Sequence, residues 1–362
     1  MAAADLDQAW PEPRANPHLV GHEAAEAALR EGWDSGRLHH AWLIAGPRGI
    51  GKATLAFRLA RFVLAGGEGA LPGGLEIGAA HGVFHRVASG GHGDLRVLEI
   101  QLNEKTGHMR KEIDVAQARD LGQFLTLKPA EGGWRVAIVD AADDLNNSSA
   151  NALLKLVEEP PPRTLMILVA HAPAALLPTI RSRCQRLVLR PLAPEAASDL
   201  IAPWLPDDVP EAERLELVRL ADGSPGRALG LHAEGALALQ RELLALLGPL
   251  GDGRAVDVQA LHALAGRLGG RAGAGSFAVL TELLGAWLTR LVRLGASGEP
   301  PAGATDELLV RLAGRAHLER WIEVWEKVNA LVERTEAVNL DQKQILVTLV
   351  SAFEKTARGS AA

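Results

Sequence analysis

The chain has 362 residues, a formal net charge of −6 at neutral pH and a hydrophobic share of 48%. This length predicts two or three domains with a core large enough to need no staples. The negative charge gives no general attraction to nucleic acid, and the one cysteine, Cys184, excludes an internal disulfide and a cysteine-based zinc site. We find no signal peptide and no apolar run of about 18 residues, so we expect a cytoplasmic protein without membrane function.

Residues 1–190 predict an α/β domain. Short apolar runs alternate there with helical patterns, which is typical of a parallel sheet with helices on both faces. Residues 66–93 are rich in glycine and show little periodicity, so we expect an insertion or flexible excursion. Strands are predicted near residues 41–45, 95–100, 135–140, 165–170 and 186–190.

The sequence after residue 190 predicts helices only. A short set of helices runs over 191–235 and a longer set over 236–362, so we predict two helical domains. Ser224 followed by Pro225 is a typical helix start, with the serine as the cap. A tryptophan-rich helical face follows near the C-terminus, which predicts a core face or, as the alternative, a subunit interface. This face contains Trp321, Trp325, Val328, Leu331 and Val332.

Residues 46–53 read Gly-Pro-Arg-Gly-Ile-Gly-Lys-Ala, a phosphate-binding loop without its final hydroxyl. In the complete pattern, backbone N–H groups point at phosphate oxygens, the lysine adds a positive charge and Ser or Thr ligates magnesium. The predicted strand before the loop and a predicted helix over 54–62 after it agree with this motif. The alternative is a glycine-rich turn that binds nothing. The residues predicted to bind phosphate are Gly46, Gly49, Gly51 and Lys52.

The groups needed for metal-assisted hydrolysis are incomplete. Ala53 stands where the hydroxyl belongs, and the side chain of Thr54, one position later, should point roughly 100° away from the metal. The predicted strand 135–140 ends in Asp140, which could hold magnesium through water. The next residue is Ala141, where an active ATPase places a glutamate. We therefore expect weak hydrolysis or none.

Nearby polar residues offer no replacement for the missing groups. Asp143 and Asp144 follow the strand, but we expect them to begin a new turn and face elsewhere. Asp140 itself has a plain alternative interpretation as a solvated aspartate at a strand end. Three histidines of the glycine-rich segment lack cysteine partners and a tight second pair, so we predict surface histidines and no metal site. They are His81, His85 and His92.

Residues 151–160 read Asn-Ala-Leu-Leu-Lys-Leu-Val-Glu-Glu-Pro, and residues 181–184 read Arg-Ser-Arg-Cys. In this order and spacing they resemble the bacterial clamp-loader subunits of the AAA+ superfamily. Residues 37–42, just before the phosphate loop, resemble the same family. The resemblance is strong over about residues 14–235, and the remainder matches only as a helical domain of suitable size.

The resemblance implies an architecture and two arginine roles. Residues 1–190 would be the P-loop AAA+ core, 191–235 a small helical lid and 236–362 an all-α collar for oligomerisation. Arg183 takes the place of a trans arginine finger, which reaches the ATP phosphates of a neighbouring subunit; a planar, permanently charged guanidinium suits this task. Arg227 takes the place of a sensor that approaches nucleotide in the same subunit.

Other positions of the family pattern are weaker or lost. Residues 19–22 resemble a segment that lies over adenine, although the match is short. The position of a first sensor, usually Thr or Asn, falls at residues 170–172, which read Ala-His-Ala. Most relatives carry a four-cysteine zinc module before the aspartate-bearing strand, and this chain does not, so we predict no zinc.

The resemblance implies the loader subunit whose own ATP site is eroded. We expect a stator of the DNA polymerase III holoenzyme that completes the AAA+ ring and helps load the sliding clamp on primed DNA during replication. Implied partners are the gamma/tau ATPase subunit, the delta subunit, the clamp and, through the assembly, primed DNA. The chain itself is not expected to be a polymerase. The predicted ATP-binding residues are Gly46, Gly49, Gly51, Lys52, Thr54, Asp140 and Arg227.

Two alternatives stay open. The chain could be an autonomous or motor AAA+ ATPase, in which case turnover would not require Ala53→Thr and Ala141→Glu. It could also be a nucleic-acid adaptor that binds DNA in a salt-sensitive way. The basic strip for that adaptor would be Arg181, Arg183, Arg186 and Arg190.

Overall fold

The computed structural model describes residues 10–70, 73–103, 107–131, 133–268, 274–338 and 341–359. The chain forms two compact units, one up to Ala228 and one from Leu229. The finer division into core, lid and collar stays a prediction. No helix in the described ranges is both long and apolar enough to cross a membrane.

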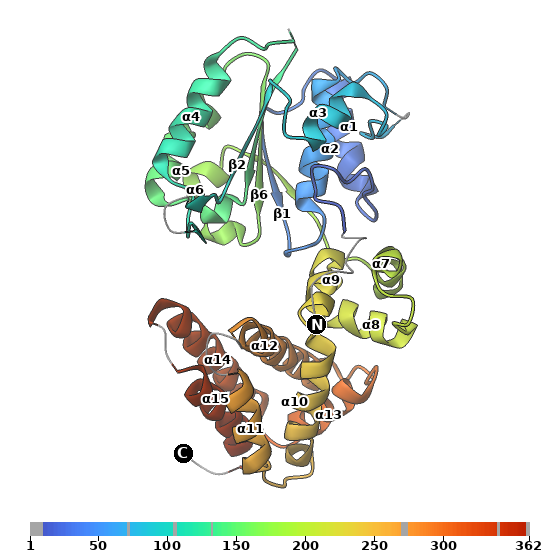
Figure 1. Ribbon diagram of the computed structural model, residues 1–362, viewed down its shortest axis with the longest axis vertical. Coiled ribbons are helices and arrows are strands. Elements are labelled where there is room, and N and C mark those ends of the chain that lie inside the picture. The colour runs from blue at the N-terminus through green and yellow to red at the C-terminus, as the bar shows by residue number, and fades with distance from the viewer. Residues whose placement is uncertain are drawn as a thin grey trace. The chain divides into compact units, whose positions relative to one another are not determined.

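The first unit contains a five-stranded parallel sheet in the order β2-β5-β6-β1-β7 (Figure 1). The central strands are continuous runs of buried apolar residues, as expected where helices cover both faces. All five predicted strands are confirmed, with ends that differ by at most two residues. Their bounds are β1 Ala41–Ala45, β2 Leu95–Glu99, β5 Arg135–Asp140, β6 Thr164–Ala170 and β7 Gln185–Val188. A short antiparallel pair, β3 Leu102–Asn103 and β4 His108–Met109, was not predicted.

Helices cover both faces of the sheet, which confirms the predicted fold class. Figure 1 shows α1, α2 and α3 on one side of the strands and α4, α5 and α6 on the other. A separate buried apolar cluster fills each side. The bounds are α1 Glu23–Asp34, α2 Lys52–Leu64, α3 Gly82–Ala88, α4 Val115–Thr126, α5 Asn147–Glu158 and α6 Pro178–Arg181. Short 3₁₀ turns η1 Ala142–Asp144 and η2 Pro173–Ala175 follow β5 and β6.

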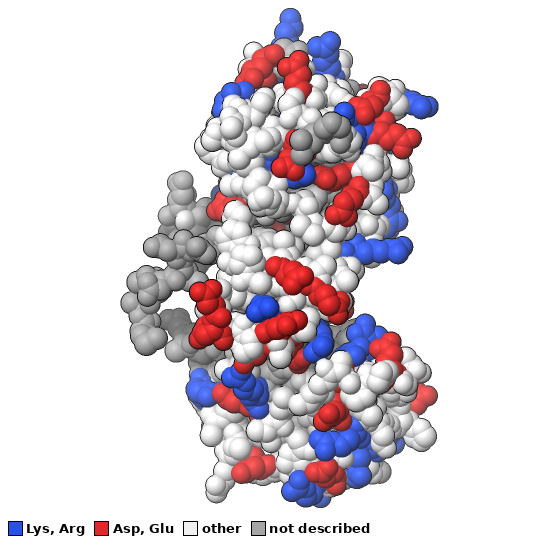
Figure 2. Space-filling view, turned by 90° about the vertical axis from the view of Figure 1, so that its right-hand side faces the viewer, with Lys and Arg blue, Asp and Glu red and all other residues white. Residues whose placement is uncertain are grey.

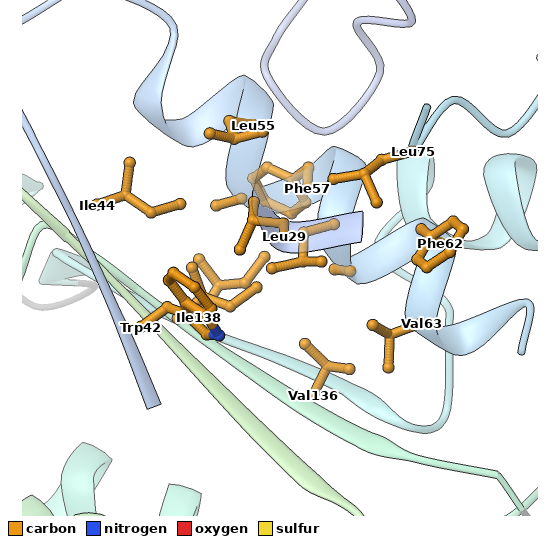
Figure 3. Close-up of a cluster of buried hydrophobic side chains, with 14 of the residues drawn as sticks. Leu29, Trp42, Ile44, Leu55, Phe57, Phe62, Val63, Leu75, Val136 and Ile138 are labelled. Carbon is orange, nitrogen blue, oxygen red and sulfur yellow. The ribbon is translucent and has the colours of Figure 1, made fainter. Parts of the chain in front are cut away.

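We expected an insertion or flexible excursion over residues 66–93, and the described part of this segment folds against the core instead of forming an excursion. It contains α3 and an isolated bridge between Ala70 and Ile77, and its side chains enter the core beside α2. Leu75 and Ile77 are 0% and 1% exposed. Figure 3 shows Leu75 among the buried side chains of α1, α2 and the sheet. Sequence periodicity missed the segment because its apolar residues are spaced by glycine turns rather than by a regular element.

Helices alone continue after the sheet, as predicted. Pro225 begins α9 as expected, but the hydroxyl of Ser224 is buried without a hydrogen-bond partner, so its predicted role as a side-chain cap is wrong. The elements are α7 Pro194–Ile201, η3 Ala202–Trp204, α8 Glu211–Leu220 and α9 Pro225–Ala233. The second unit continues with α10 Ala236–Gly251, α11 Val258–Leu268, α12 Ala274–Ser297, α13 Ala304–Ala313, α14 Leu318–Val338 and α15 Gln342–Ala357.

The tryptophan face of α14 divides between core and surface. Trp321 is 0% exposed and packs against Phe353 of α15, whereas Trp325 is 39% exposed. The core prediction therefore holds for Trp321 and Val328, which is also buried.

Candidate functional site

The phosphate loop turns directly from β1 into α2. Gly51 has φ +106° and stands at the N-terminus of α2, and Gly49 has φ +74°; L side chains rarely adopt such conformations. The sheet edge and α2 together aim the backbone N–H groups of the loop at one place. Among the described residues, no hydrogen bond engages the N–H groups of Gly49 and Ile50. The loop therefore keeps free donors for an anion.

Lys52 lies inside the loop rather than extended into water. It is 3% exposed, and its ammonium donates to the carbonyl oxygens of Gly46 and Pro47 at 2.7 and 2.5 Å. Burial lowers the pKa of Lys52 to about 8, while the carboxylates of Asp140 and Asp143 oppose that shift. A phosphate bound at the loop would place a negative charge beside this ammonium and so oppose the effect of burial on the pKa of Lys52.

Asp140 ends β5 beside Glu99, its partner in the register with β2. Burial, followed by the charge of Glu99, raises the pKa of Asp140 to about 6, with Lys52 opposing the shift. Asp140 does stand at a strand end, but it is half-buried rather than fully solvated. We call residues 46–52 with Asp140, Asp143 and His171 the phosphate-loop site.

The two positions where the complete pattern places an oxygen for the metal or its water are alanines, Ala53 and Ala141. Ala141 is 4% exposed and offers no oxygen after Asp140. Thr54 is 8% exposed, in the first turn of α2. No group of three or more His, Cys, Asp or Glu residues that could hold a metal ion is found in the described part of the chain.

Asp143 is a residue of this site that sequence reasoning missed. We expected it to face elsewhere, but its carboxylate accepts the backbone N–H groups of His171 and Ala172 at 2.5 and 2.9 Å. It therefore ties η1 to the loop after β6. Burial, together with the charges of Lys52 and Arg48, lowers the pKa of His171 to about 4. The first-sensor position thus holds a histidine that stays neutral at pH 7. An aspartate within four residues of a predicted strand end was the available signal.

Backbone contacts join two further predicted segments to the loop. The N–H of Gly226, at the start of α9, donates to the carbonyl of Gly49 at 2.9 Å. A Cβ on Gly49 would stand 2.3 Å from the backbone nitrogen of Arg227, so this approach needs glycine. On the other side, His22 Nε2 lies 2.8 Å from the carbonyl oxygen of Ile50. The backbone of Arg227 and the side chain of His22 therefore lie at the phosphate loop, while their roles toward a nucleotide stay predictions.

Arg183 lies apart from these residues, after α6 and before the edge strand β7. Its side chain is 41% exposed and forms an ion pair with Glu158 at 3.0 Å. The guanidinium also donates to the carbonyl of Thr179 at 3.1 Å and to the hydroxyl of Ser182 at 3.4 Å. Cys184 of the same motif is buried, and burial raises its thiol pKa to about 11, so this thiol is inert packing.

The face of the molecule drawn in Figure 2 shows no single basic region. Arg186 and Arg190 are exposed near Arg183. Figure 2 shows acidic and basic side chains interspersed on the face that it presents. The observed distribution therefore gives the adaptor alternative no additional support.

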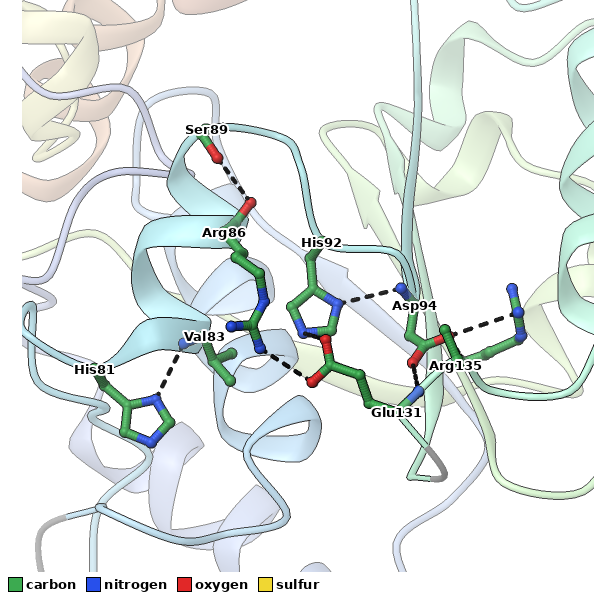
Figure 4. Close-up of polar contacts among 9 residues, drawn as sticks. His81, Val83, Arg86, Ser89, His92, Asp94, Glu131 and Arg135 are labelled. Atoms are coloured by element: carbon green, nitrogen blue, oxygen red, sulfur yellow. Dashed lines mark hydrogen bonds and ion pairs between the residues drawn. The ribbon is translucent and has the colours of Figure 1, made fainter.

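The histidines of the glycine-rich segment serve structural contacts. His81 caps α3 through Val83, and His92 is 4% exposed, so the prediction of a surface histidine is wrong for His92. Burial lowers the pKa of His92, and its Nδ1 accepts the N–H of Asp94 (Figure 4). Asp94 in turn accepts the backbone N–H of Glu131 at 3.0 Å.

Comparison with known proteins gives a consistent result. A family model described as DNA polymerase III, delta subunit, matches residues 21–193. The Pseudomonas aeruginosa protein named DNA polymerase III subunit delta' is 40% identical over 197 residues, which are 54% of this chain and 56% of that protein. The Escherichia coli protein named DNA polymerase III subunit tau is 32% identical over 269 residues, 71% of this chain and 39% of that protein.

These matches are partial in length. The chain spans about half the length of the Pseudomonas relative and less of the Escherichia one. A solved structure from Thermotoga maritima, titled as a DNA polymerase III, gamma subunit-related protein, covers 91% of this chain and 99% of its own at 19% identity, with a TM-score of 0.38.

Proposed function

Because the chain belongs to the clamp-loader family of DNA polymerase III, among the delta-prime subunits, we propose that it is the stator of a clamp loader. It completes a ring of AAA+ subunits without being a motor itself. In the ring it supplies Arg183 to the ATP bound by a neighbouring subunit. The assembly uses that ATP to open the sliding clamp and place it on primed DNA during replication.

One observation carries this proposal: the phosphate-loop site keeps its phosphate-binding half and lacks its hydrolytic half. Loop N–H groups and Lys52 are in place, yet Ala53 and the buried Ala141 stand where metal ligation and water activation need oxygens. Arg183, in contrast, is exposed and charged. An incomplete site, together with an accessible arginine elsewhere on the same unit, favours a subunit that serves its neighbour's chemistry.

ATP binding to this chain is part of the proposal. The residues fit a phosphate because, within the described ranges, the N–H groups of Gly49 and Ile50 are free and the ammonium of Lys52 has only carbonyl oxygens as hydrogen-bond partners. Lys52 and the loop N–H groups would hold the phosphates, and Arg227 would lie near them. The residues do not fit a hydrolytic metal, and with a single cysteine we propose no zinc. Bound nucleotide would then stiffen the unit rather than drive it.

The proposed partners follow from the family. The subunit that offers its ATP to Arg183 would be a gamma/tau ATPase, and the delta subunit would complete the ring. Contact with clamp and DNA would come through the assembly, since the net charge of −6 gives this chain no general affinity for DNA.

The test is ATP hydrolysis by a loader reconstituted from cognate subunits, stimulated by clamp and primed DNA. The variant Arg183→Ala is compared with wild type, with Arg186→Ala as the matched exposed control, and with the chain alone. We expect no turnover by the chain alone, normal assembly of each variant, and loss of activity at one interface for Arg183→Ala only.

Other outcomes would redirect the assignment. Turnover by the chain alone, with Arg183→Ala behaving as wild type, would favour the motor ATPase that the tau similarity keeps in view. Equal losses in both arginine variants together with salt-sensitive DNA binding by the lone chain would favour the adaptor.

A further inference from the structure

Glu158 is the charged partner of Arg183, and its position runs against local electrostatics. It is the last residue of α5, where the helix dipole disfavours a carboxylate. Glu159 follows it and forms no ion pair in the described part of the chain. The guanidinium of Arg183 lies 3.0 Å from Oε1 of Glu158 and offsets the unfavourable position of this carboxylate at the helix end. The other glutamate provides a natural control.

The anchor of this ion pair is rigid. Leu153 and Val157 of α5 are 0% and 2% exposed and pack in the core on this side of the sheet. The carboxylate of Glu158 therefore starts from a fixed backbone, although its side chain is 43% exposed. The other contacts of Arg183 are neutral and come from Thr179 and Ser182, close to it in sequence. Among the described residues, Glu158 is the one anion paired with this guanidinium.

We propose that Glu158 competes with the neighbour's ATP for Arg183. A carboxylate and a phosphate offer similar paired oxygens to one guanidinium fork, so the two cannot both occupy it fully. In the separate subunit Glu158 holds Arg183 against α5. At the completed interface the phosphates displace Glu158, and the carboxylate returns to water. The inference rests on the proposed trans role of Arg183 and adds a residue that restrains it.

The competition has a predictable size. Ion pairs between partly exposed side chains contribute little, and their loss changes an equilibrium by about 1.4-fold to fivefold. Glu158 should therefore restrain Arg183 without blocking it. Removing its charge frees the guanidinium and raises kcat/KM for ATP at that interface by up to about fivefold.

The experiment uses the reconstituted loader with full-length subunits. ATP hydrolysis is measured for wild type, Glu158→Gln, the control Glu159→Gln, Arg183→Ala and the double variant Arg183→Ala with Glu158→Gln. We expect a higher kcat/KM for Glu158→Gln and none of this gain for Glu159→Gln. In the Arg183→Ala background the Glu158 change should have no effect, because the competitor then has nothing to hold.

The double-mutant cycle distinguishes a failure of the proposed competition from a failure of the proposed role of Arg183. If Arg183→Ala loses activity while Glu158→Gln matches Glu159→Gln or lowers kcat/KM, the competition is wrong and the stator function stands. A Glu158 effect that persists without Arg183 shows a purely structural role and also overturns the competition. If Arg183→Ala has no effect on the loader, the trans finger and the competition built on it both fall.

Discussion

The phosphate-loop site and the ion pair of Arg183 with Glu158 belong to the same unit but differ in how far their charged groups are exposed to water. Lys52 is 3% exposed with its pKa lowered to about 8, and burial raises the pKa of Asp140 to about 6. The side chain of Arg183 is 41% exposed and forms an ion pair with Glu158 at the surface. The proposed function would account for this contrast. Groups that bind a ligand within their own chain can be buried, whereas an arginine that serves the ATP of another subunit must stay accessible and charged.

The largest expected effect separates the two regions by activity. Arg183→Lys keeps the positive charge but loses the planar fork, so we expect ATP hydrolysis at that interface to fall by at least about a hundredfold. The measurement is steady-state hydrolysis by the reconstituted loader. Arg186→Lys is the matched control. Activity of Arg183→Lys close to that of wild type would mean that a point charge suffices and the finger geometry is wrong.

The second effect concerns the fold of the phosphate-loop site. Gly49→Ala places a Cβ at positive φ and 2.3 Å from the backbone nitrogen of Arg227, so we expect a loss of about 2–4 kcal/mol in the free energy of unfolding. Gly36→Ala has a similar φ but open space around it, and should cost about 1 kcal/mol. Urea unfolding of the isolated chain measures both. Equal losses would show that the contact between Gly49 and α9 carries no free energy.

A third effect comes from pH. The raised pKa of Asp140 means that the folded state binds its proton more tightly than the unfolded state, so stability falls as pH rises from about 4 to about 6. Asp140→Asn removes this slope and should raise stability above pH 6 by about 3 kcal/mol, because the folded state then no longer holds this disfavoured charge.

The pKa of Asp140 depends on the charged groups around it, so the pH measurement needs a control. Lys52, Glu99, Asp144 and Arg48 all act on Asp140, and Asp120→Asn, an exposed position, is the control. Unfolding free energies at pH 4, 5, 6 and 7.5 decide the matter. A slope unchanged in Asp140→Asn would assign it to another group.

The smallest effect tests the missing hydrolytic half. Nucleotide affinity of the wild-type chain should change by less than about twofold when magnesium is removed by chelation, because Ala53 and Ala141 offer the metal no oxygen. The double variant Ala53→Thr with Ala141→Glu should gain a magnesium dependence of about tenfold. Calorimetric titration with ATP measures both. A strong magnesium dependence in the wild-type chain would return the motor ATPase to the lead.

Much of the core was predictable because buried parallel strands leave a strong pattern. The run Ala41–Ala45 and the aspartate at the end of Arg135–Asp140 located two strands and the phosphate loop without tertiary information. The segment 66–93 was misjudged because glycine turns break the periodicity on which prediction depends. His92 was misjudged for a related reason, since burial of a single polar residue is decided by what packs over it.

The site was predictable where a motif names residue types in order. Gly49, Gly51, Lys52 and the absence of oxygens at 53 and 141 could be identified from the letters alone, because backbone approach to phosphate demands glycine and metal ligation demands oxygen. Asp143 was not, since its role depends on two backbone N–H groups that lie 28 and 29 residues further along the chain.

The order of residues alone establishes the chemistry available to this protein: an incomplete phosphate loop, an arginine in the Ser-Arg-Cys stretch and a helical C-terminal half. Which of these groups share an environment depends on how the chain packs in three dimensions. Burial lowers the pKa of Lys52 and raises that of Asp140. Packing also brings the N–H of Gly226 to the carbonyl of Gly49 and pairs Glu158 with Arg183. The reason is physical: residue identity sets the charge or hydrogen bond that a side chain can offer, whereas desolvation and neighbouring charges exist only once distant segments pack together.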